Sequence, residues 1–271
     1  MNIVLNHGIF GFDTFEGINY FNGVAEHLRA TFPDVRVFVS RVPPAGTIIA
    51  RGEALGLRIN RAFEEGTLDD SKPVHIIAHS MGGLDARYLL SPNNPDNMLD
   101  RVASLTTIST PHRGSPIADL LIDLLDPADI SSEESEIGAI ILERFRKVGI
   151  ELGGLSNLTT AEVGLFNSQF PDDPDLPKHA VAGIGRGRSF LGIHLNTCRV
   201  LRLAYTIIEK KTGEANDGLV AVSSAAWGLE PELWSADHAD EIGHDLDHGL
   251  HAQPSQFDHL SRYAALVARF R

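Results

Sequence analysis

Short runs of consecutive apolar residues alternate with longer amphipathic segments along the first 110 residues of the chain. The runs are too short for helices and are rich in valine and isoleucine, so each predicts a strand buried on both faces. These strands are expected at residues 2–6, 35–39, 73–78 and 102–108. Between them, apolar residues recur at helical spacing, which predicts helices at residues 20–31, 48–65 and 81–90. Such an alternation predicts an α/β fold with a mostly parallel sheet and helices on both faces.

The alternation stops after Pro111, and residues 115–170 contain helical patterns without a convincing strand. Two apolar stripes, at 117–125 and 137–148, flank an acidic stretch. The residues alone leave two interpretations open: fixed helices that pack on the sheet, or a lid over an apolar site. Strand-like residues return at 178–183, followed by helical patterns near 196–211 and 258–270. Because no repeat or linker divides the chain, we expect one domain of 271 residues with a helical insertion.

Composition narrows the classes of function. The chain has 23 basic and 36 acidic residues, a formal charge of −13 that disfavours nucleic acid as a partner. Its single cysteine, Cys198, excludes an internal disulfide, and no apolar run reaches the ~18 residues of a membrane span. Residues 1–5 form a strand-like run with no basic region or cleavage site before it. The localisation therefore stays open between a cytoplasmic protein, a mature form, and a protein exported without a cleaved signal, and the oligomeric state stays open as well.

The clearest chemical signal lies where the third expected strand ends, in the sequence Ala-His-Ser-Met-Gly-Gly at residues 78–83. A serine between small residues at a strand-to-helix turn is typical of a nucleophile elbow, since the turn is sharp and larger side chains would collide there. Ser80 is the predicted nucleophile. The start of the following helix would point backbone N–H groups at an oxyanion beside it.

A serine nucleophile needs a base and an acid, which follow it in the chain order acid, then histidine, in folds of this kind. Asp217 lies within Asn-Asp-Gly, a sequence that also forms turns, and a turn at the end of a strand would still present the carboxylate. Eight histidines follow Ser80, so His238 shares candidacy for the base with its neighbours.

Five motifs together resemble the bacterial triacylglycerol lipases of the Proteus and Pseudomonas type. They are Asn-His-Gly-Ile-Phe-Gly-Phe-Asp at 6–13, the elbow at 78–83, Ser-Thr-Pro-His-Arg-Gly-Ser at 109–115, Asn-Asp-Gly-Leu-Val at 216–220, and Asp-His-Ala-Asp-Glu-Ile at 237–242. The motifs follow the order of the family and cover nearly the whole chain. The resemblance implies an α/β-hydrolase fold, with a lid at about 115–170.

The same resemblance implies site residues and a reaction. It makes Ser80 the nucleophile, Asp217 the acid and His238 the base, and it assigns the oxyanion hole to the backbone N–H groups of Ile9 and Met81. The expected activity is hydrolysis of carboxylic esters, acylglycerols or similar acyl esters, through an acyl-serine intermediate. The expected enzyme is a lipase or carboxylesterase that needs no cofactor and contacts lipid interfaces transiently. An acyltransferase or a non-catalytic binding module are the alternatives.

Three features point away from metal and nucleotide sites. Relatives hold calcium with two aspartates, and Asp240 matches one, but residues 176–208 contain no acidic residue that would match the other. We therefore expect no calcium site or a weak one, with Asp240 as a local hydrogen-bond acceptor. Helical spacing of His244, His248 and His251 makes zinc conceivable, although a solvated acidic loop is favoured. Residues 183–188 lack the third glycine of a dinucleotide loop.

Overall fold

A six-stranded sheet forms the centre of the computed structural model, which describes residues 1–9, 14–15, 18–124, 132–147, 154–185, 189–190, 193–194, 198, 201–246 and 255–271. The strand order is β10-β7-β6-β5-β1-β4, and all neighbouring strands are parallel. The strands are β1 (Asn2–Asn6), β4 (Arg36–Val39), β5 (Val74–His79), β6 (Val102–Ile108), β7 (Lys178–Gly183) and β10 (Glu232–Trp234). Two small hairpins pair β2 (Thr14–Phe15) with β3 (Ile18–Asn19) and β8 (Ser189–Phe190) with β9 (Ile193–His194).

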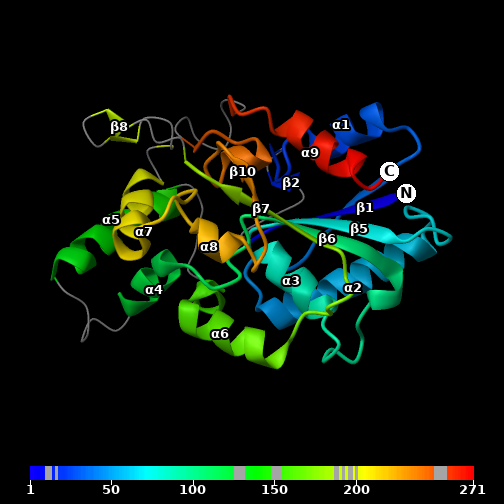
Figure 1. Cartoon of the computed structure of the whole chain (residues 1–271), viewed down its shortest axis with the longest axis horizontal. Coiled ribbons are helices and arrows are strands. Elements are labelled where there is room, and N and C mark those ends of the chain that lie inside the picture. Colours follow the sequence, from blue (N-terminus) through cyan, green and yellow to red (C-terminus); the bar gives the residue numbers. More distant parts are fainter. Residues whose placement is uncertain are drawn as a thin grey trace.

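Helices cover both faces of this sheet, as predicted. Figure 1 shows α1 (Val24–Thr31) and α9 (His259–Ala268) on one side, and α2 (Ile48–Glu64) and α3 (Met81–Leu89) on the other. Successive side chains of β1 contact the two helical layers alternately. Ile3 packs with the α1 and α9 side chains, while Val4 packs with those of α2 and α3. The four strands predicted in the first 110 residues are present, and burial on both faces of the three central ones, β1, β5 and β6, explains why apolar residues follow one another in them.

Two helix boundaries differ from the prediction for local reasons. The helix expected from residue 20 begins at Val24, because Gly23 has a left-handed backbone with φ 68°. The helix expected near residue 196 begins at Arg202, after a stretch that lies partly outside the described residues. In contrast, α2 begins where expected, since the Thr47 side chain accepts a hydrogen bond from the backbone N–H of Ala50.

A third group of helices lies beyond the carboxyl ends of the strands (Figure 1). It contains α4 (Pro116–Asp123), α5 (Ser132–Lys147), α6 (Thr160–Gln169), α7 (Arg202–Thr212) and α8 (Val222–Ala225), and the short 3-10 helices are Leu99–Arg101, Leu155–Leu158 and Asp240–Ile242. An apolar cluster joins this group to α3. Its members include Met81, Leu84, Ile117, Leu120, Leu121, Ile141, Val163, Phe166, Ala204 and Ile208.

The two predicted apolar stripes supply part of this cluster. Ile117, Leu120 and Leu121 of α4 are buried, as is Ile141 of α5, whereas Ile140 remains 43% exposed. Residue 125, the Phe145 side chain and residue 148 lie outside the described part of the chain. No helix in the described ranges combines the length and apolar character that a membrane crossing requires.

The two tryptophans of the chain lie in different layers. Trp234 is fully buried beneath α1 and α9, where its ring packs edge-on against Tyr263. Trp227 follows α8, and its ring stacks on His112 with centroids 4.6 Å apart. The Trp227 indole N–H donates a hydrogen bond to Asp172, so it links the segment after α6 to the segment after α8.

Candidate active site

Ser80 sits at the turn between β5 and α3 in a backbone conformation that is rare for a residue with a side chain, with φ 56° and ψ −135°. Its N–H donates to the carbonyl of Ile108 on the neighbouring strand β6, which holds the strained turn in place. Gly82 must lack a side chain, since a Cβ there would lie 2.7 Å from the backbone oxygens of Asn6 and His7. The local structure is thus the nucleophile elbow that the sequence predicts.

Asp217 and His238 lie together, as predicted. The Nδ1 atom of His238 is 2.7 Å from Oδ2 of Asp217, and the Asp217 carboxylate is fully buried. The other carboxylate oxygen accepts hydrogen bonds from the backbone N–H groups of Leu219 and Val220. The Asp217 side chain therefore closes a local turn and still presents one oxygen to the imidazole, and its role as the acid stays a prediction.

The His238 ring reaches the elbow. Its centroid lies 4.5 Å from that of His79, the residue directly before Ser80. The structure therefore brings Asp217 and His238 beside the turn that holds Ser80, although 158 positions separate Ser80 from His238 in the chain. His238 is only 9% exposed, so water has limited access to the Asp217–His238 pair.

The two residues predicted to form an oxyanion hole flank the serine. Met81 is the first residue of α3, so its backbone N–H has no acceptor within the helix. Ile9 follows Gly8, whose backbone touches Ser80: a Cβ on Gly8 would lie 2.7 Å from Cβ and 3.1 Å from Oγ of the serine. Both N–H groups thus belong to backbone immediately beside the predicted nucleophile.

A buried ion pair fixes the loop before Ile9. The Arg51 guanidinium donates to the Asp85 carboxylate and, through Nη2, to the carbonyl oxygen of His7 at 2.7 Å. The Asn6 side chain donates to the carbonyl of Gly82 at 2.9 Å. Burial raises the pKa of Asp85 to about 6, and the nearby Arg51 charge opposes this shift. These bonds anchor the loop to α2 and α3 before it reaches Ser80.

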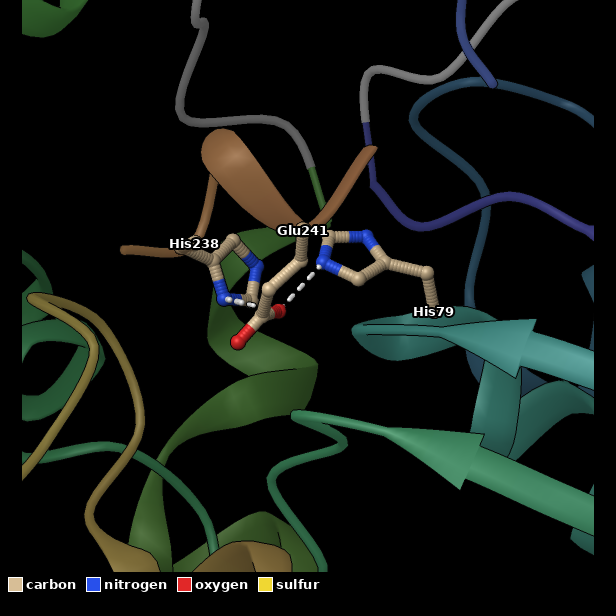
Figure 2. A group of neighbouring side chains, drawn as sticks. All are labelled: His79, His238 and Glu241. Atoms are coloured by element: carbon tan, nitrogen blue, oxygen red, sulfur yellow. Dashed lines mark hydrogen bonds and ion pairs between the residues drawn. The ribbon is translucent and has the colours of Figure 1, made fainter. Parts of the chain in front are cut away.

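A second buried carboxylate, Glu241, lies between His79 and His238 (Figure 2), and sequence reasoning assigned it no role. Its Oε2 atom is 3.0 Å from Nε2 of His79 and 4.0 Å from Nδ1 of His238. Its Oε1 atom accepts a hydrogen bond of 2.6 Å from the Ser109 hydroxyl. Burial and the Asp217 charge raise the pKa of Glu241 well above its usual value, and the Ser109 hydrogen bond opposes them.

An unusual backbone conformation allows the Ser109 hydroxyl to reach Glu241. This residue follows β6 with φ 44°, a left-handed conformation that few non-glycine residues adopt. Its hydroxyl accepts a hydrogen bond from the N–H of Gly183, the last residue of β7. Ser109 lies in the motif at residues 109–115 and Glu241 in the motif at 237–242. Their place in these motifs is the signal in the sequence that could have indicated a role for them.

Three side chains around the site place possible metal-binding atoms close together. One atom each from His79, His238 and Glu241 lie within 4.8 Å of one another, but the same side chains already bond to Asp217, Ser109 and each other. Asp240 accepts a hydrogen bond from the N–H of Asp237 and contacts the Ser255 hydroxyl. The weak or absent calcium site stays a prediction.

The histidine-rich segment is only partly described. The Nε2 atom of His244 lies 2.9 Å from the carbonyl oxygen of Tyr20 and 3.0 Å from that of Asn19. His248 and His251 lie outside the described residues, as do residues 186–188 of the glycine-containing loop. Among the histidines of this segment that the structure describes, His244 therefore contacts the backbone of residues 19–20.

A serine elbow after a central strand of a parallel sheet, with acid and histidine following in that order, defines the class of α/β-hydrolases. A family model described as a PGAP1-like alpha/beta domain matches residues 56–125. The structure of Staphylococcus hyicus lipase superposes with a TM-score of 0.65 at 18% identity, covering 99% of this chain and 94% of that one. The predicted fold class is confirmed.

Two relatives identify the family within this class. A triacylglycerol lipase of Vibrio cholerae is 31% identical over 92% of this chain and 81% of its own length. Triacylglycerol lipase 2 of Saccharomyces cerevisiae is 33% identical over 83% of this chain, and the match spans 62% of that relative. The chain belongs to the triacylglycerol lipase family. Membership of this family confirms the predicted class of enzyme, the carboxylic ester hydrolases.

Proposed function

We propose that this protein hydrolyses acyl esters, acylglycerols among them, through an acyl-enzyme on Ser80. The observation that carries the proposal is the 2.7 Å contact between Asp217 and His238, beside the strained turn that holds Ser80. An imidazole that donates through Nδ1 to a buried carboxylate presents Nε2 as a base. The names of the relatives supply the substrate class, since they are triacylglycerol lipases.

The reaction follows from these groups. His238 takes the proton of the Ser80 hydroxyl while Oγ attacks the ester carbonyl, and Asp217 stabilises the imidazolium. The N–H groups of Ile9 and Met81 hold the tetrahedral oxyanion, where a single donor contributes about 3 kcal/mol. His238 then gives its proton to the departing alcohol. Water, activated by the same base, attacks the acyl-serine, releases the carboxylic acid and restores Ser80.

The proposal includes a lid formed by α4, α5 and α6 between residues 115 and 170. Met81, beside the nucleophile, belongs to the same apolar cluster as Leu121 and Ile141. Separating α4 and α5 from this cluster would expose apolar surface, at ~25 cal/mol for each Å². A lipid surface would replace the lost contacts, so the open form would be favoured at an interface.

The test of this function is turnover of a nitrophenyl butyrate by the whole chain and by Ser80→Ala. We expect kcat to fall by roughly 10⁴–10⁶ with the circular dichroism spectrum unchanged, because the triad acts as a unit. Ser71→Ala, at an exposed position before β5, is the matched control and should keep its activity. Near-normal turnover by Ser80→Ala would exclude the proposed nucleophile. An alcohol acceptor added to the assay separates hydrolysis from acyl transfer by its products.

A further inference from the structure

A hydrogen-bonded chain of side chains leads from the oxyanion loop to the loop that carries His238. It starts at the Gly8 N–H, which donates to the Tyr20 hydroxyl at 3.1 Å. The Tyr20 hydroxyl lies 2.7 Å from Nδ1 of His79. On the other side of the imidazole ring, Nε2 of His79 lies 3.0 Å from Glu241, a contact that Figure 2 marks. The chain of bonds therefore joins residues of four segments around Ser80.

Each bond of this chain pairs a donor with an acceptor. The Gly8 N–H can only donate, so the Tyr20 oxygen accepts from it. A phenol hydroxyl and a neutral imidazole both donate and accept, so one proton lies between Tyr20 and Nδ1 of His79 and another between Nε2 of His79 and Glu241, which also accepts from Ser109. Burial lowers the pKa of His79 well below its usual value and raises that of Tyr20, so both stay neutral. Every polar group of the chain has a partner.

The oxyanion loop needs such a restraint because of Gly8. Only glycine fits there, since a Cβ would lie 2.7 Å from Cβ of Ser80 and 2.8 Å from the Tyr20 oxygen. Glycine, however, leaves the backbone more freedom than any other residue, and the Ile9 N–H follows directly. Arg51 holds the His7 carbonyl on one side of Gly8. The Tyr20 hydroxyl holds the N–H of Gly8 itself.

We propose that Tyr20 and His79 are positioning residues of the oxyanion hole, which hold Gly8 and Ile9 against Ser80 and link them through Glu241 to the loop of His238. This inference rests on the proposed function, because it assigns the Ile9 N–H to the oxyanion. Neither residue touches the reacting atoms. Their effect is on where a donor lies when charge develops on the substrate oxygen.

The test is the rate of a soluble ester compared with that of the matching thionoester, in which sulfur replaces the carbonyl oxygen. Sulfur is larger and accepts hydrogen bonds weakly, so a hole built for oxygen favours the oxo ester. Tyr20→Phe keeps the ring packed between His7 and His79 and removes only the hydroxyl. We expect kcat on the ester to fall about 10–100-fold with KM within about twofold, and the ratio of the two rates to fall by about tenfold.

Tyr263→Phe is the matched control. Its hydroxyl is buried and has no hydrogen-bond partner in the described part of the chain, and its ring packs on Trp234 and Phe21. Removing that hydroxyl should leave the ratio unchanged. His79→Gln retains an amide near Nε2 and loses the contact to Tyr20, so it should lower the ratio as Tyr20→Phe does. The double variant should then lose less than the product of the two effects.

The outcomes separate this inference from the proposed function. A wild-type ratio in Tyr20→Phe and His79→Gln, whether turnover is normal or falls equally on both substrates, overturns the positioning role and leaves the hydrolase intact. A folded wild-type protein that cleaves no ester overturns the proposed function, and the positioning role falls with it. A ratio that falls in both variants and not in Tyr263→Phe supports the inference.

Discussion

Two buried regions meet at α3, and they are held together by different forces. On one side of Ser80 lies a polar centre in which Asp217, His238 and Glu241 bond to specific partners at 2.6–3.0 Å. On the other side, Met81 and Leu84 join the apolar cluster of α4 and α5. Hydrogen bonds need a defined partner and direction, whereas apolar burial depends mainly on area. Loss of a single polar atom should therefore abolish the function of the polar centre. The helices of the apolar cluster, in contrast, should be able to separate and pack together again.

In this comparison, the largest effect on activity is expected from a conservative substitution in the polar centre. Asp217→Asn keeps the size of the side chain and removes the charge that orients His238. We expect kcat to fall by about 10⁴, because the amide favours the wrong tautomer of the imidazole. Nitrophenyl ester turnover measures this loss, and Asp34→Asn at an exposed position is the control. Turnover close to that of the wild type would show that another group orients His238.

A charge placed in the apolar cluster should change the activation of the enzyme at a lipid interface and leave the cleavage of dissolved ester unchanged. Leu121 is fully buried in α4, so Leu121→Asp should weaken the closed arrangement of the helices. We expect the gain in rate above the solubility limit of the ester to shrink severalfold, with turnover of dissolved ester retained. Leu57→Asp, at a position 71% exposed on α2, is the control. No rise in the parent beyond the solubility limit would indicate a fixed cap and a carboxylesterase.

The polar centre should also make stability depend on pH. Burial and the neighbouring Asp240 charge raise the pKa of Asp237 to about 7, which is above the usual range of a carboxyl group. The folded state then binds more protons than the unfolded state between about pH 4 and 7, so this group lowers the free energy of unfolding as pH rises. The buried histidines with lowered pKa, His79, His112 and His244, act in the opposite sense.

Asp237→Asn isolates the carboxyl contribution. The change in Tm from pH 5 to pH 8 should become more positive, by a few degrees, than in the parent. Thermal unfolding of both proteins across this range measures the difference. Equal pH dependence in the two proteins would show that Asp237 titrates at its ordinary value in the folded state.

The smallest effect is expected from chelation. Asp240 already contacts Ser255 and the backbone of Asp237, and no second carboxylate was found in the sequence where relatives have one. An excess of chelator should therefore shift Tm by less than about 1 °C. A calcium site filled at about 100 times its Kd would contribute about 2.7 kcal/mol, which the same curve would detect. A drop of several degrees, reversed by calcium, would contradict the expectation.

Local patterns in the sequence predicted the sheet and the elbow because both depend on neighbouring residues. The strands at residues 2–6 and 102–108, for example, contain consecutive apolar or small residues and are buried over most of their length. The turn at Ser80 needs small residues close by, which the sequence displays. Family resemblance then selected His238 from eight histidines, a choice that periodicity could not make.

The bonds between distant segments could not be predicted from the sequence. Glu241 bonds to Ser109 and His79 across 132 and 162 positions, and Tyr20 bonds to His79 across 59. Nothing in the local pattern of these residues encodes such pairing. The apolar stripe at 137–148 likewise did not predict which of its residues are buried. Ile141 is fully buried in the cluster, whereas Ile140 is 43% exposed.

The separate surroundings of the two tryptophans give the protein two independent optical reporters. Trp234 lies in the layer under α1 and α9, whereas Trp227 stacks on His112, just before the helical insertion, and bonds to Asp172, just after it. Because the chain has no third indole, Trp227→Phe and Trp234→Phe each leave a single emitter. Fluorescence from Trp227 then follows the anchorage of the insertion, and fluorescence from Trp234 follows the core of the sheet. The two signals separate local detachment of the helices from global unfolding.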